Sequence, residues 1–157
     1  MLGRLFPSHV DNRFGGHRSA LWLLGLLVAL KLVVAVNSIF NTATVAQGAD
    51  GIPLDGFGPA AAREVLTLFA LVALGQLILA LVALAALVRW RALVPFLYLV
   101  SLVEMLGRRM IVRMNDAAQP VASPIAWYVT WGVLILLIVG LALSLVPGRS
   151  PIGEKTS

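Results

Sequence analysis

The sequence predicts an all-α, polytopic membrane protein with four transmembrane helices packed as an antiparallel bundle. Of its 157 residues, 60% are hydrophobic and 12% are charged, whereas soluble domains are about 45–50% apolar and about 25% charged. Four long apolar runs follow one another, and a helix needs about 20 residues to cross a bilayer. We expect one membrane domain over residues 1–147 and a disordered tail over residues 148–157.

The first two helices are the most regular. The first is expected at about residues 20–40, where Lys31 is the one charged residue. The second is expected at about residues 60–88, with Pro59 opening it at a position where the missing N–H of proline costs nothing. The loop between them, residues 41–58, is expected to fold as an outer cap, with Ile52, Leu54 and Phe57 packing onto the top of the bundle.

The third and fourth helices are expected at about residues 92–113 and 124–146. The link before the third helix is so short that the second and third helices must be antiparallel neighbours. The third run is apolar only as far as Leu106, so a spanning helix must carry three arginines with it. A tilted or re-entrant third helix is therefore the alternative. The fourth helix is uncharged, and Ser123 is its expected N-cap.

Composition excludes several classes of function. Cysteine is absent, which removes thiol catalysis, disulfides and Cys-ligated metals. Both histidines, His9 and His17, precede the first apolar run, so no His-based haem or metal site can form inside the membrane. We therefore expect no catalytic residues, no bound metal and no cofactor. The net charge of +5 is interpreted as an orientation signal, not as affinity for nucleic acid.

Lys and Arg in the loops favour cytoplasmic N- and C-termini. With that orientation seven basic residues lie on the inner side, Arg4, Arg13, Arg18, Arg89, Arg91, Arg149 and Lys155. Four lie on the outer side, Arg63, Arg108, Arg109 and Arg113. The chain resembles small four-span bacterial inner-membrane proteins, so the expected location is the inner membrane of a bacterium. It differs from four-helix thiol-redox proteins in having no cysteine, and from small multidrug transporters in having Lys31 where they have a carboxylate.

Three polar side chains on three helices are expected at one depth. At 1.5 Å per residue, Lys31 lies about 15 Å from the inner end of its helix, and Gln76 and Glu104 lie about 18 Å from theirs. A charge in lipid costs roughly 2.5–3.5 kcal/mol on insertion scales. We therefore expect Lys31 to pair with Glu104 and Gln76 to bond to one of them.

Helical periodicity adds further polar residues to this site. Ser38 lies on the Lys31 face of the first helix, and Ser101 and Arg108 lie on the Glu104 face of the third. Arg109 and Arg113 are one turn apart on another face. We interpret them as contacts for an anion or a lipid head group, or as interfacial anchors.

Three interpretations of the site remain open. The pair holds the helices in register; or Lys31 extends to the interface while Glu104 pairs with Arg108 four residues on; or the site responds to protons or ions. The function expected first is a non-catalytic inner-membrane bundle, acting as an accessory or assembly subunit. Its expected partners are membrane lipids and either another protein or further copies of itself. The alternatives are a small transporter or channel that uses Glu104 as a protonatable site, and an outer-face binder of anionic lipid.

Overall fold

The computed structural model describes residues 2–7, 9–115 and 124–147. These residues form helices and connecting segments, with no strand among them. The elements in chain order are α1 (Leu2–Leu5), α2 (Arg18–Phe40), α3 (Thr42–Gly48), η1 (Leu54–Gly56), α4 (Pro59–Arg89), η2 (Arg91–Leu93), α5 (Val94–Met114) and α6 (Pro124–Leu145). The expected tail at 148–157 and the expected cap Ser123 lie outside the described residues.

Three helices are long and apolar enough to cross a membrane. They are α2, α4 and the Tyr128–Leu145 part of α6. Their outer faces expose large apolar side chains, among them Trp22, Val33 and Leu68, which a soluble protein rarely does over so wide an area. The chain is therefore an integral membrane protein built from helices.

The fourth long helix, α5, differs from these three in composition. It is one unbroken helix of 21 residues, about 30 Å long at 1.5 Å per residue. Its second half carries Glu104, Arg108, Arg109 and Arg113. Because of these charges, α5 is not among the helices that are apolar enough to cross a membrane by composition. Its length alone is sufficient to cross the hydrocarbon core.

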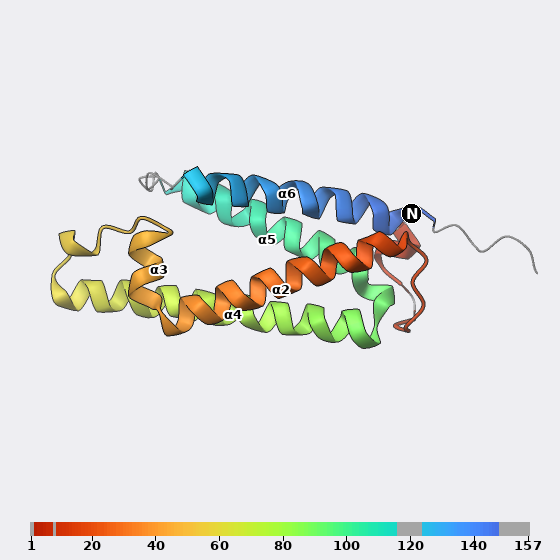
Figure 1. Cartoon of the computed structure of the whole chain (residues 1–157), viewed down its shortest axis with the longest axis horizontal. Coiled ribbons are helices and arrows are strands. Elements are labelled where there is room, and N and C mark those ends of the chain that lie inside the picture. Colours follow the sequence, from red (N-terminus) through yellow and green to blue (C-terminus); the bar gives the residue numbers. More distant parts are fainter. Residues whose placement is uncertain (1, 8, 116–123, 148–157) are drawn as a thin grey trace, which may run out of the picture.

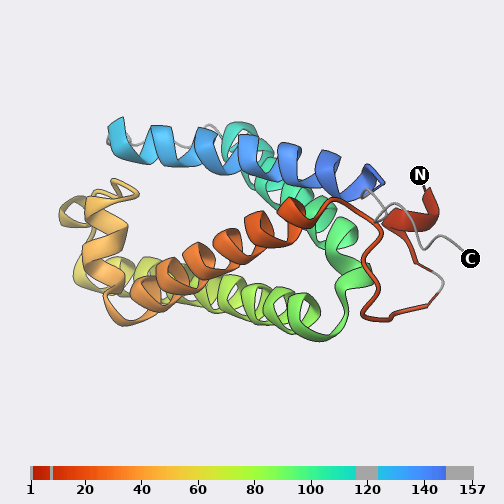
Figure 2. The same cartoon turned by 45° about the vertical axis from the view of Figure 1, so that its right-hand side comes forward.

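The long helices form two pairs. Helix α2 packs along α4, and α5 packs along α6, while α2 also lies against α6. The short element η2 reverses the chain between α4 and α5 (Figure 1). Figure 2 shows the two pairs close together at the end where the N-terminus lies and farther apart toward α3. We call these the closed end and the open end.

The closed end is held together by an apolar core around Tyr98. The side chain of Tyr98 is fully buried, and its hydroxyl donates a hydrogen bond of 2.6 Å to the backbone carbonyl of Ala20 on α2. Gly140 on α6 lies so close to the Tyr98 ring that a Cβ there would collide with it. The buried neighbours in this core are Ala20, Leu24, Leu27, Val28, Ala83, Val94 and Leu137.

The N-terminal segment packs across the closed end. The backbone N–H of His17 donates to the carbonyl of Leu143 at 3.0 Å, and that of Ala92 donates to the carbonyl of Asp11 at 3.2 Å. Gly16 is buried, and a Cβ there would collide with the carbonyl of Ser144. The segment therefore lies against the ends of α5 and α6.

The loop of residues 41–58 covers the open end of one pair only. Its helix α3 packs on α2 and α4. Of the three residues expected to pack there, Leu54 is buried and Ile52 is half-buried, whereas Phe57 is exposed because it follows η1 at the edge of the loop. Asn41 donates a side-chain hydrogen bond of 2.7 Å to Asn37 one turn earlier, and Gly51 has a positive φ of 65°, which glycine adopts without strain.

Candidate functional site

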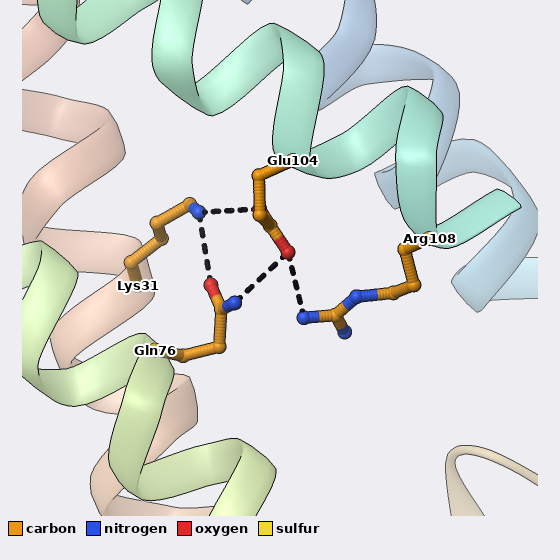
Figure 3. Close-up of polar contacts among 4 residues, drawn as sticks. All are labelled: Lys31, Gln76, Glu104 and Arg108. Atoms are coloured by element: carbon orange, nitrogen blue, oxygen red, sulfur yellow. Dashed lines mark hydrogen bonds and ion pairs between the residues drawn. The ribbon is translucent and has the colours of Figure 1, made fainter. Parts of the chain in front are cut away.

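The polar residues of three helices meet midway along the molecule. Lys31 comes from α2, Gln76 from α4, and Glu104 and Arg108 from α5, and their polar ends point toward one another (Figure 3). The expected Lys31–Glu104 pair is confirmed, with 3.2 Å between Nζ and Oε2. We call these four side chains the polar network.

Glu104 is the hub of the polar network. Its Oε2 accepts a hydrogen bond from Lys31, while its Oε1 accepts from Gln76 Nε2 at 2.9 Å and from Arg108 Nη2 at 2.8 Å. Lys31 also donates to Gln76 Oε1 at 3.0 Å. Glu104 thus pairs with Lys31, as the first interpretation expects, and with Arg108, as the second expects, but Lys31 bonds within the network and does not extend to the interface.

The network is only partly shielded. The side chains of Lys31 and Glu104 are 24% and 23% exposed, and that of Arg108 is 53% exposed. With these three groups ionised the network has one surplus positive charge. Taking ions out of water costs several kcal/mol each unless they are well paired, and partial exposure lowers that cost.

One face of the network borders a cavity of about 480 Å³ between the two helix pairs. We call it the central cavity. Its polar lining includes the other residues expected at the site, Ser38 and Ser101, as well as Arg109. Toward the closed end a second cavity of about 40 Å³ touches Lys31 and Glu104 and is otherwise lined mainly by apolar core residues such as Leu24. Lys31 and Glu104 thus contribute to both cavities.

The two arginines expected to hold an anion are separated by the fold. Arg109 lines the central cavity, and its guanidinium carbon lies 5.1 Å from the centre of the Trp131 ring on α6. A guanidinium on an aromatic face is held by cation–π attraction. Arg113, one turn further along α5, is exposed and is not part of the cavity lining.

Asp50, which the sequence did not mark as a site residue, also lines the central cavity. It follows α3, so it belongs to the α2–α4 pair, and it faces the charge of Arg108 on the other pair. Its side chain is exposed, but neighbouring atoms partly desolvate the carboxyl group and raise its pKa above the ordinary value, while the attraction of Arg108 acts in the opposite direction. The only sequence signal was its place between glycines in the cap.

The carboxylate of Glu104 is engaged within the network, since both of its oxygens already accept hydrogen bonds. Within the described ranges, no three His, Asp or Glu side chains come together in a way that would hold a metal ion.

Comparisons with protein families, curated proteins and solved structures find no match to this chain. The functional conclusion therefore depends on the geometry of the polar network and the central cavity.

Proposed function

We propose that this chain is a non-catalytic membrane protein that binds a ligand in the central cavity. The observation that carries the proposal is that the polar network forms one wall of this cavity. Ionisable groups within membrane helices mark functional sites by default because they are costly to keep there. A volume of about 480 Å³ lies within the range of small-molecule sites, about 300–1,000 Å³.

We also propose that α5 is the fourth span and that the four long helices form an antiparallel bundle. Three observations support this: the length of α5, its packing along α6, and the engagement of its charges. Glu104 and Arg108 bond within the network, and Arg109 contacts Trp131, so these groups need not face lipid.

The surplus of basic residues near the closed end supports cytoplasmic termini in a bacterial inner membrane. In that orientation the central cavity and Arg109 belong to the outer half of the bilayer. The expected role as an accessory subunit is compatible with ligand binding. The cavity is the reason for proposing ligand binding as well.

Proton-coupled transport is less well supported by this geometry than binding. Glu104 would have to release three donors, Lys31, Gln76 and Arg108, in each cycle. A hydrogen bond to a charged group contributes about 1.5–3 kcal/mol, so the ion-paired form is strongly favoured. The proposal therefore assigns the network to the wall of a binding site.

Two neighbouring residues of α2 provide the test. Val34 lines the central cavity, whereas Val33 is also exposed but lies outside the lining. Val34→Trp should fill the cavity and Val33→Trp should not. Native mass spectrometry of protein purified from its own membranes should show a co-purified molecule that Val34→Trp loses and Val33→Trp keeps. Identical bound molecules in both variants would overturn the proposal.

A further inference from the structure

We propose that the ligand of the central cavity is an amphipathic anion, with its charged group at Arg108 and Arg109 and its hydrocarbon chain along the apolar wall. This inference rests on the proposed function and names the class of ligand. The shared chemistry is a carboxylate or phosphate on an alkyl chain, supplied either by a free amphiphile or by a lipid of the bilayer.

The charges that line the cavity favour an anion. Lys31, Arg108 and Arg109 are positive, and Asp50 and Glu104 are negative, which leaves one positive charge in excess. Glu104 is already neutralised within the network. Because Glu104 bonds both Lys31 and Arg108, the five charges together leave one positive charge uncompensated, and a ligand with one negative charge balances it.

The two guanidinium groups have donors left for a ligand. A guanidinium has five N–H donors, and Arg108 uses one nitrogen, Nη2, to bond Glu104 while more than half of its side chain is exposed. Arg109 is held on the face of Trp131, and a cation–π contact uses no N–H donor. A guanidinium group suits carboxylate and phosphate oxygens because its forked donors match two oxygens at once.

The rest of the wall selects for an apolar chain. Most of the lining is apolar and comes from α2, α4 and α6, including Leu30, Val34, Phe69, Val72, Val129 and Val133. A small hydrated anion would lose its water against such a wall without gaining hydrogen bonds from it. An alkyl chain makes dispersion contacts with such a wall and has no polar atom that would be left unpaired there.

The test uses matched probes and matched arginine variants. The purified full chain is placed in phosphatidylcholine nanodiscs, and its thermal unfolding is followed as oleate or oleyl alcohol is added. The two probes share one alkyl chain and differ in the charge of the head. Oleate should stabilise the protein at a mole fraction about tenfold lower than oleyl alcohol, as the loss of one charged hydrogen bond implies.

Arg109→Gln should weaken stabilisation by oleate about tenfold, and Arg109→Lys should weaken it less. Arg113→Gln, one turn away and outside the lining, should leave it unchanged. Nanodiscs that contain phosphatidylglycerol then separate the sources. Stabilisation by this lipid, lost in Arg109→Gln, indicates a bilayer lipid; stabilisation by oleate alone indicates a free amphiphile.

Equal stabilisation by oleate and oleyl alcohol, blocked by Val34→Trp and not by Val33→Trp, would show that the cavity binds a ligand but that the anion assignment is wrong. No stabilisation by oleate or phosphatidylglycerol would also overturn the assignment. The co-purification experiment with the two valine variants then judges the proposed function separately.

Discussion

The helices pack differently at two positions along their length, at Tyr98 and at Glu104. Tyr98 and Glu104 are six residues apart on α5, about 9 Å along its axis. At Tyr98 the helices form an apolar core in which α6 contributes Leu137 and places Gly140 directly against the Tyr98 ring. At Glu104 three helices meet through hydrogen bonds, and a cavity lies beside them.

The difference separates a level at which the helices pack tightly from the level at which we propose a binding site. Small residues allow close helix packing in lipid, where dispersion replaces the hydrophobic effect between helices. Lys31, Glu104 and Arg108 are long side chains, and their hydrogen bonds need space and access to polar surroundings. The closed end therefore fixes the helices, and the polar network sets how they separate.

The largest effect is expected at the hub of the network. Glu104→Gln removes the only carboxylate of the network and leaves Lys31 and Arg108 without their anion, which should cost about 2 kcal/mol after allowing for partial exposure. Lys31→Met should cost about 1 kcal/mol, because Glu104 keeps Gln76 and Arg108. Unfolding by sodium dodecyl sulfate in mixed micelles measures both.

The double variant Lys31→Met/Glu104→Gln supplies the control. It should be more stable than Glu104→Gln alone, since only the exposed Arg108 is left to reach water. Equal losses of stability in the two single variants would indicate a simple two-residue pair. No loss of stability in either variant would show that the network does not stabilise the fold.

A smaller effect is expected at the closed end. Gly140→Ala places a methyl group where the Tyr98 ring lies, and overpacking of this kind costs about 1–3 kcal/mol; we expect about 1.5 kcal/mol. Gly132→Ala on the same helix is the matched control, because nothing lies within 4 Å of its added Cβ. Similar thermal unfolding of the two variants would contradict the tight packing described at Tyr98.

The smallest effect concerns the pH dependence of stability at the cavity. Because partial desolvation raises the folded-state pKa of Asp50, the folded protein holds this proton more tightly than the unfolded chain. Its contribution to stability is therefore fully present below the ordinary pKa and is lost as the pH rises through the raised pKa. Asp50→Asn should remove this contribution. The difference in free energy of unfolding between the wild type and the variant should therefore decrease as the pH rises through that range.

A wild-type pH profile that Asp50→Asn leaves unchanged would mean that its surroundings do not desolvate the Asp50 carboxyl group.

The sequence could predict the long helices and the central ion pair for one reason. Lipid makes uncovered charges and short apolar runs costly, so length, hydropathy and depth carry strong information. The observed long helices begin and end within two residues of the expected positions. Counting residues from the helix ends was enough to place Lys31, Gln76 and Glu104 at the same depth.

Other features depend on packing that no local pattern records. The bond from Tyr98 to the backbone of Ala20 needs the relative tilt of α5 and α2. Helix α3 lies in a stretch that we expected to be a loop, and no local pattern marks the packing of Gly16 against Ser144. The central cavity arises from the separation of two helix pairs, and that separation is a property of the whole bundle.

The central claim is that the polar network sets the separation of the helix pairs at the cavity. The chain has no cysteine, so pairs of introduced cysteines can carry spin labels for distance measurement in nanodiscs. Val36→Cys with Gly132→Cys reports on the open end, and Trp22→Cys with Ala142→Cys reports on the closed end.

We predict narrow distance distributions for both pairs in the otherwise wild-type protein. Glu104→Gln should shift or broaden the distribution at the open end and leave the closed end unchanged. An open-end distribution that Glu104→Gln does not alter, or an equal change at both ends, would contradict the account.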